Sequence, residues 1–142
     1  MNISYPANFK PDGDGLIFVA FPDVPGCSTN GEGQSKAYEC AQDALGIMLD
    51  DYIWRHGALP RRSNPGKDQV VVELSALDSS KLSLALEMAK AKLTKTELAA
   101  RLRINEKEVR RILAVGHNTK LTTLEAAFRA IGRKITIQVE AA

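Results

Sequence analysis

The sequence has few residues of the kinds that bind metals or form crosslinks. Its 142 residues include two cysteines, Cys27 and Cys40, and two histidines, His56 and His117. The cysteines lie thirteen positions apart, which matches no CxxC metal or redox motif, and two cysteines imply no disulfide framework. Two distant histidines make a His-rich metal site unattainable. We therefore expect buried reduced thiols, no metal site and no cofactor.

Long apolar runs are also missing. No run reaches the length that spans a membrane, and the first residues show no basic stretch followed by an apolar run, which is the pattern of a secretory signal. We expect a cytoplasmic protein with no membrane partner.

The charge is small overall but unevenly distributed. The net charge is +2, with 44% hydrophobic and 25% charged residues, a globular composition. Residues 1–75 hold 6 lysines and arginines against 10 aspartates and glutamates, which gives −4, whereas residues 76–142 hold 13 against 7, which gives +6. This asymmetry predicts two domains with different partners, and nucleic acid is the candidate partner of the basic one.

The first half predicts a small sheet with one long helix. Strands are expected at residues 3–9, where Pro6 favours a sheet edge, and at 16–21, 27–31 and 70–74. Apolar residues recur at helical spacing from about Gln34 to His56, and Gly57 supplies a stop. The fold is therefore α+β, with one helix on a small sheet. The expected apolar face of that helix comprises Ala37, Ala41, Ala44, Leu45, Met48 and Tyr52.

After Ser75 the pattern changes to short helices. A first helix is marked by apolar residues between 82 and 89. Three capping boxes then begin at Thr94, Asn105 and Thr122, each with a glutamate three residues later. Their spacing predicts a compact array of short helices, and the strict alternation of residues 134–139 predicts a terminal strand.

Residues 94–113 have the spacing of two short helices joined by a tight turn. With residues 123–132, this segment resembles the lambda-repressor (Cro/C1) type of helix-turn-helix across some fifty residues. The resemblance implies DNA binding, with the N-terminal residues of the second helix in the major groove. Small or apolar residues stand where the pair must bury its inner faces: Leu98, Ala99, Leu102, Ile104, Val109 and Ile112.

The resemblance assigns the outward-facing residues of this pair to DNA. Arginine and lysine can bind guanine O6 and N7, and glutamate can accept a hydrogen bond from cytosine N4. The start of the first helix is placed to contact phosphate, and Lys120 to grip the DNA backbone. The alternative is a solvated charged face. The expected DNA-binding residues are Lys95, Thr96, Glu106, Lys107, Arg110, Arg111 and Lys120.

Two features depart from the helix-turn-helix pattern. Arg103 occupies the turn position where glycine is common, so its backbone must adopt left-handed or altered geometry. Glu106 and Glu108 place negative charge near phosphates. Glu108 is explained as a capping partner, whereas Glu106 either reads a base or lowers affinity.

A second motif leads into the long helix. Residues 21–32 match the stretch F-x-D-x-P-G-C-x-T-x-G-[DE] of the HicB antitoxin family, which the sequence resembles. Gly33 departs from it, because a hydroxyl helix cap is usual there. Together with the C-terminal half, the resemblance covers nearly the whole chain. The matching positions are Asp23, Pro25, Gly26, Cys27, Thr29, Gly31 and Glu32.

The HicB resemblance implies a partly formed ribonuclease H-like fold in residues 1–75, which would bind a HicA-type toxin, a small mRNA-cleaving ribonuclease. The resemblance also implies repression of its own operon, as in HicB proteins that have a helix-turn-helix C-terminal half. A −4 domain suits a basic enzyme, because complementary potentials steer association. We place the toxin contact on the motif, with the alternative that its residues serve only the turn and strand. The expected toxin-binding residues are Asp23, Cys27, Thr29, Asn30 and Glu32.

Residues 80–140 would form the DNA-binding and dimerisation domain. Its helices lie in 80–131, and a strand at 133–140 would pair across a two-fold axis through Ile135, Ile137 and Val139. The expected partners are a HicA-type toxin, operator double-stranded DNA and further copies of the chain, as a homodimer and, through both domains, a tetramer.

Two other function classes are alternatives for this sequence. One is a dimeric transcription regulator whose N-terminal domain senses a small molecule. The other is a metal-dependent ribonuclease H-like nuclease, which needs several carboxylates converging on paired metal ions. Residues 3–9 carry no acidic side chain. We therefore expect no catalytic residues and no enzyme activity.

Overall fold

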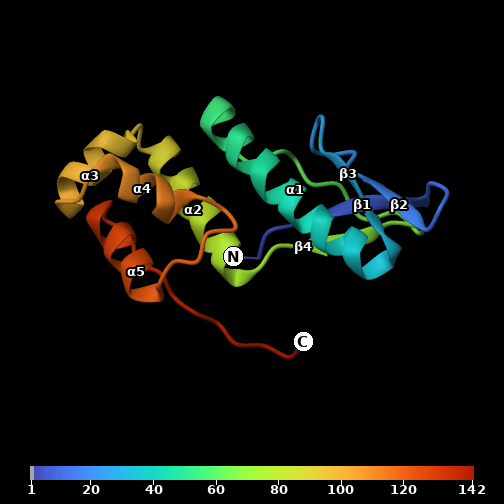
Figure 1. Ribbon diagram of the computed structural model, residues 1–142. Helices are drawn as coiled ribbons and strands as arrows, with labels where there is room; N and C mark the ends of the chain where they lie inside the picture. Colours follow the sequence, from blue (N-terminus) through green and yellow to red (C-terminus); the bar gives the residue numbers. More distant parts are fainter. Residues whose placement is uncertain (1) are drawn as a thin grey trace.

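The computed structural model describes residues 2–142. An antiparallel four-stranded sheet with helix α1 (Gly33–His56) across one face forms one end of the molecule, and the helices of the second half form the other (Figure 1). Helix α2 (Ala76–Lys90) packs against α1. One hydrophobic core therefore runs from the sheet into the helical half.

The sheet has the strand order β3-β2-β1-β4, with every neighbouring pair antiparallel. The expected strands are confirmed, each within two residues of its observed ends. The strands are β1 (Ser4–Pro11), β2 (Leu16–Ala20), β3 (Ser28–Glu32) and β4 (Val70–Glu73).

The expectation that Pro6 places its strand at the sheet edge is wrong. Strand β1 lies between β2 and β4 in the sheet order. It pairs with β4 over Ser4–Ala7, where Pro6 faces Val71, and with β2 over Asn8–Pro11. Each half of β1 thus pairs with one neighbouring strand. Pro6, which has no backbone N–H, is tolerated because β1 is paired on only one side there.

Helix α1 ends as the sequence predicts, at Gly57, whose φ of 70° is left-handed. Its buried face is turned slightly from the expected one. A stripe of every fourth residue faces the core, so that Leu49 and Ile53 are buried, whereas Ala44, Met48 and Tyr52 are half-buried. The buried stripe is Ala37, Ala41, Leu45, Leu49 and Ile53.

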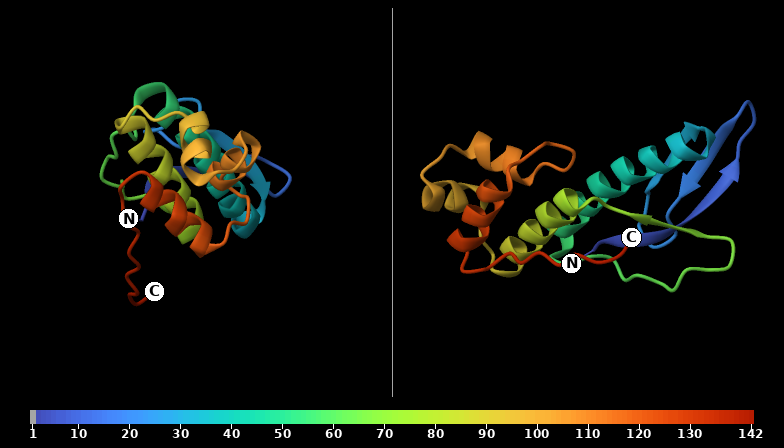
Figure 2. Two further views of the ribbon diagram at one scale, coloured as in Figure 1. Left: turned by 90° about the vertical axis from the view of Figure 1, so that its left-hand side faces the viewer. Right: turned by 90° about the horizontal axis from the view of Figure 1, so that it is seen from below.

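The helices α3 (Lys95–Leu102), α4 (Glu106–Leu113) and α5 (Leu121–Ala130) gather beside α2, away from the sheet (Figure 2). Helix α2 begins with a cap that sequence analysis missed, since the Ser75 hydroxyl accepts from the backbone N–H of Asp78 at 3.0 Å. The box predicted at Thr122 is wrong. Helix α5 is preceded by Lys120, which gives no side-chain cap, and Thr122 lies within the helix.

The predicted terminal strand is absent from the single chain, where residues 133–140 carry no regular secondary structure. Ile135 packs against the core, while Ile137 and Val139 are 67% and 91% exposed. The tail runs back toward the N-terminus, where the Asn2 side chain donates to Glu140 Oε1 at 3.4 Å. An extended segment needs a neighbour to form a ladder, so pairing between two copies stays a prediction.

Candidate functional site

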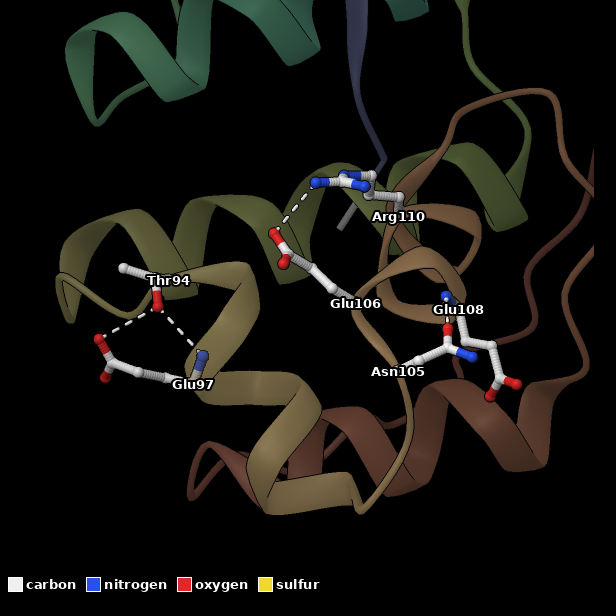
Figure 3. A network of polar contacts seen from close by, with 6 residues as sticks. All are labelled: Thr94, Glu97, Asn105, Glu106, Glu108 and Arg110. Carbon is white, nitrogen blue, oxygen red and sulfur yellow. Dashed lines mark hydrogen bonds and ion pairs between the residues drawn. The ribbon is translucent and has the colours of Figure 1, made fainter.

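Helices α3 and α4 are short and begin with side-chain caps (Figure 3). Thr94 Oγ1 accepts from the backbone N–H of Glu97 at 3.0 Å, and its hydroxyl donates to the Glu97 carboxylate at 3.2 Å. Asn105 Oδ1 accepts from the backbone N–H of Glu108 at 2.8 Å. These caps satisfy N–H groups that have no partner inside each helix, so both helix starts are well defined.

The turn between α3 and α4 has the left-handed geometry expected of a glycine position. Arg103 has φ 57° and ψ 43°. Its N–H donates to the Ala100 carbonyl at 3.3 Å, and the N–H of Ile104 donates to the Ala99 carbonyl at 3.1 Å. These two bonds end α3. The prediction for Arg103 is confirmed, and the sharp reversal sets α4 across α3.

The inner faces of the two helices are buried as expected. Leu98 and Val109 are fully buried, and Ala99 is nearly so. Burial of these faces turns the opposite side of each helix outward. Among the expected DNA-binding residues, Lys95 and Glu106 are half-buried, and the exposed ones are Thr96, Lys107, Arg110, Arg111 and Lys120.

Glu106 forms an ion pair with Arg110, with 3.1 Å between Oε1 and Nη2 (Figure 3). Both side chains lie at the surface of α4 and are one helical turn apart, so the pair is held only weakly. Glu106 therefore contacts Arg110, one helical turn away, in the free protein. This contact was not predicted from the sequence.

Lys95 makes a contact with α1 that was not predicted from the sequence. Its ammonium lies over the ring of Trp54, 5.0 Å from the ring centre. Trp54 belongs to α1, and its indole N–H donates to Asp50 Oδ1 at 3.2 Å. Burial raises the pKa of Asp50, and the Trp54 hydrogen bond and the Lys95 charge partly offset that rise. Lys95 therefore joins α3 to α1 in the free protein.

A cavity of about 580 Å³ opens between α4 and α5. Arg111, His117 and Lys120 line it together with Thr122 and Thr123. It continues the basic surface of α4 to the start of α5. Such a surface can accept the phosphates of a nucleic-acid backbone.

The turn motif between β2 and β3 is built from two successive turns. The Val24 N–H donates to the Phe21 carbonyl at 3.2 Å, and the Cys27 N–H donates to the Val24 carbonyl at 3.0 Å. The Phe21 N–H donates to the Cys27 carbonyl at 3.1 Å and closes the hairpin. Gly31 lies against the start of α1, where an added Cβ would come within 2.7 Å of the Ala37 backbone. The motif therefore brings β3 directly onto the helix.

The residues expected to contact a toxin fall into two groups. Asp23 accepts hydrogen bonds from the Ser63 N–H and hydroxyl, both at 2.9 Å, and thereby anchors the loop after α1. Cys27 is 3% exposed, and burial raises the pKa of its thiol from 9.0 to about 11. The placement of Cys27 on the partner surface is thus corrected, because it is a core residue. Thr29 is half-buried, and Asn30 and Glu32 are exposed.

The loop after α1 carries further ties that sequence analysis missed. The Tyr5 hydroxyl donates to the Pro60 carbonyl at 2.6 Å, and Arg62 Nε donates to the Ser4 carbonyl at 2.9 Å. Burial, followed by the charge of Asp23, raises the pKa of Tyr5 to about 12. These bonds hold residues 60–63 against β1.

Lys81 was also missed, although it is fully buried. Its ammonium donates to the carbonyls of Arg111 at 3.1 Å and Ala114 at 2.8 Å, and to Thr119 Oγ1 at 2.8 Å. The signal was available in the sequence, because Lys81 stands four residues before Ala85 on the apolar face of α2.

Within residues 2–142, no three histidine, cysteine or acidic side chains are grouped as a metal site would require. None of the helices described combines the length and the apolar character needed to cross a membrane.

Comparison with solved structures finds a chain of the "Toxin-Antitoxin complex from Streptococcus pneumoniae", with a TM-score of 0.46 and 23% sequence identity over 76% of this chain and 93% of that one.

Similarity to characterised sequences is stronger. The chain is 35% identical over 139 residues to "Antitoxin HicB 1" of Photorhabdus laumondii, covering 98% of this chain and 88% of that protein. It is 29% identical over 133 residues to "Antitoxin HicB" of Escherichia coli K12, covering 94% and 96%. A family model described as "HicB_like antitoxin of bacterial toxin-antitoxin system" matches residues 4–83. The chain therefore belongs to the HicB-like antitoxin family.

Proposed function

We propose that this protein is the antitoxin of a type II toxin-antitoxin pair, which neutralises a HicA-type mRNA-cleaving toxin and represses its own operon by binding operator DNA. Membership of the HicB-like family supports the antitoxin role. One observation carries the DNA-binding role: two capped eight-residue helices meet at a left-handed turn and turn their basic residues outward.

Helix α4 is the proposed recognition helix. Lys107, Arg110 and Arg111 are exposed on it and can bind guanine in the major groove. The exposed ion pair of Arg110 with Glu106 is weak enough to be exchanged for a base contact. Glu106 would then be free to accept from cytosine N4.

The phosphate contacts are proposed for residues beside α4. Thr96 and the N–H groups at the start of α3 suit one phosphate, and Lys120 before α5 suits another. Lys95 reaches DNA only if it leaves Trp54, so its contribution carries the cost of breaking that contact.

The toxin surface is proposed on the free edge of β3 and its exposed neighbours. Strand β3 is an outer strand of the sheet, and Asn30 and Glu32 are exposed on it. An outer strand presents unpaired backbone groups to a partner. The −4 charge of residues 1–75 favours a basic enzyme as that partner. Asp23 and Cys27 would act by holding the hairpin in shape.

The domain division is proposed at residues 1–75 and 80–140, with the break at the Ser75 cap of α2. Because α2 packs on α1, the two domains share part of their core. The homodimer is proposed through the tail. A groove of about 540 Å³ beside the tail is lined by Leu77, Leu121 and Ile137, and Leu121 is 44% exposed. A second copy would cover these apolar groups, and contact through both domains would give a tetramer.

The experiment that tests the proposal co-expresses the full chain with a small basic HicA-type protein sought in the neighbouring genes. Growth should be arrested by that protein alone and restored by the antitoxin, and the two should co-purify. The full chain should also shift a duplex from its own promoter at salt concentrations where a random duplex stays free. Operator binding without growth rescue would indicate a stand-alone regulator, and rescue without operator binding would contradict the repressor role.

A further inference from the structure

Helix α2 contains a fully buried lysine, which is among the rarest residues in a protein core. The side chain of Lys81 extends from α2 to the end of α4. Its neighbours on the same helix, Leu82, Leu84 and Ala85, are fully buried as well. Lys81 thus belongs to the buried face of α2, and burial lowers its pKa, an effect that the charge of Asp78 partly offsets.

All three N–H groups of this ammonium have an acceptor. Two are carbonyls at the end of α4, those of Arg111 and Ala114, and the third is the Thr119 hydroxyl. An ammonium has three donors and no acceptor, so Lys81 is completely satisfied. The three bonds reach across nine residues of the chain, from the last turn of α4 to the residue before Lys120.

A second residue of α2, Asp78, also holds this segment. The carboxylate of Asp78, one turn before Lys81, accepts from the backbone N–H of Gly116 at 2.9 Å. The side chain of Val115 also lies about 3.5 Å from where a Cβ on Gly46 of α1 would be. The end of α4 and the loop after it are therefore fixed on α2 and lie close to α1.

Stability alone is a poor reason for a lysine in this position. The carbonyl end of α4 carries the negative end of the helix dipole, which favours a cation. None of the side-chain ion pairs within residues 2–142 includes Lys81, however, so oxygen acceptors without a paired carboxylate hold its buried charge, and burying a charge costs free energy. What an apolar residue cannot supply is three directed bonds to one segment.

We propose that Lys81 is a positioning residue for operator recognition. It fixes the end of α4 and the start of α5 in one arrangement, so that Arg110, Arg111 and Lys120 meet the DNA together. Because α2 packs on α1, the same bonds fix the recognition helix relative to the HicB-like domain. This inference rests on the proposed operator binding.

The test is Lys81→Met in the full chain, because methionine keeps the apolar stem and removes the ammonium. Affinity for the operator should fall at least ~10-fold at fixed salt, the loss of about one base contact. Affinity for a random duplex of equal length should change less than about twofold, since phosphate contacts tolerate several arrangements. Amide hydrogen exchange at Ala114 and Gly116 should accelerate.

Two controls separate positioning from simple destabilisation. Lys90→Met removes the same charge from the exposed end of α2 and should change neither affinity. Leu84→Ala opens the core of the same helix and should lower the melting temperature, yet the folded protein should keep its ratio of operator to random affinity. A Lys81→Met protein with an unchanged ratio, or an equal change of ratio in Leu84→Ala, would overturn the proposal.

Thr119→Val provides a second, milder test. It removes one acceptor and leaves the lysine, so a smaller loss of the same ratio is expected, and this variant decides the question if Lys81→Met does not fold. An unchanged ratio in Thr119→Val would then refute the role of Lys81. A wild-type protein that does not prefer its operator would refute the proposed repression itself, an outcome visible before any variant is compared.

Discussion

The ammonium of Lys95 lies over the ring of Trp54, 5.0 Å from its centre, and so joins the first residue of α3 to α1. Trp54 is itself held by its hydrogen bond to Asp50. Lys95, for which we propose a phosphate contact, is therefore engaged by the HicB-like half in the free protein. If Lys95 binds DNA as proposed, DNA and α1 would compete for the same ammonium.

Trp54→Leu should release Lys95 to the DNA. A cation over an exposed aromatic ring contributes ~0.5–1 kcal/mol, so the gain in affinity should be small. The clearer signature is the salt dependence, because one additional phosphate contact steepens the slope of log affinity against log salt by about 1. The measurement is fluorescence anisotropy on a random duplex at several salt concentrations. Adding Lys95→Ala to Trp54→Leu should abolish the change, and an equal slope in wild type and Trp54→Leu would show that Lys95 is not held back.

Arg103→Gly should stabilise the protein, because a non-glycine residue is strained at φ 57°. The expected gain in the free energy of unfolding is ~0.5–1 kcal/mol, which thermal or urea unfolding can detect. Ala100→Gly is the matched control, since Ala100 is exposed within α3 and glycine there should cost ~1 kcal/mol. Equal losses in both variants would mean that Arg103 is unstrained.

The features that the sequence predicted are those with local causes. Turn residues, helix periodicity and caps such as Thr94 and Asn105 act within a few positions, so the strands and α1 to α4 could be located in advance. Arg103 was identified from the resemblance to the helix-turn-helix pattern, in which glycine is common at that turn position.

The features that escaped prediction depend on contacts between distant segments. Lys81 and Thr119 lie 38 positions apart, and Asp23 and Ser63 lie 40 apart. Nothing near Pro6 reveals that β4 returns to pair with β1 and moves it away from the edge. Such pairings follow from the packing of the whole chain, which the pattern of residues along it does not encode locally.

Alkaline pH should destabilise the protein through Cys27. Because the pKa of this thiol rises from 9.0 in the unfolded chain to about 11 in the folded one, the folded state holds more protons between these values, and stability falls as pH rises from 9 to 11. The full shift corresponds to at most ~3 kcal/mol. Urea unfolding at pH 8.5 and 10.5 measures the fall. Cys27→Ala should reduce it, whereas Cys40→Ala, which keeps Cys27, should not.

The two kinds of DNA contact should respond differently to mutation. Arg110→Ala should cost ~1–3 kcal/mol on the operator and little on random DNA, if Arg110 binds a guanine. Lys120→Ala should weaken both duplexes alike and lower the slope of log affinity against log salt by about 1. Quantitative titrations on both duplexes distinguish the two patterns. Wild-type operator affinity in Arg110→Ala would remove α4 from the role of recognition helix.

The tail, residues 133–140, exposes apolar side chains that a second copy of the chain could cover. Ile137 and Val139 are largely exposed, and Leu121 is exposed in the groove beside the tail. Among residues 2–142, the backbone groups of residues 134–140 make no hydrogen bond to another backbone group, and an antiparallel copy across a two-fold axis would pair the backbone and cover the side chains together. Such a dimer can set two recognition helices about one turn of DNA apart, roughly 34 Å, to match a palindromic operator.

Truncation after Gly132 tests this arrangement. The shortened chain should lose one level of assembly in sedimentation, from tetramer to dimer or from dimer to monomer, and should bind a palindromic operator far more weakly while keeping its affinity for a half-site. Ile137→Lys and Val139→Lys, which leave the chain at full length, should act in the same direction because charge cannot be buried at the axis. Chemical denaturation of the Ile137→Lys and Val139→Lys chains should stay close to wild type at low protein concentration, since neither side chain is buried in the single chain, whereas the truncated chain also loses Ile135, which packs against the core. If the truncated chain sediments with the same number of subunits as wild type, the chain assembles through another surface. The two-fold pairing of residues 133–140 would then be wrong.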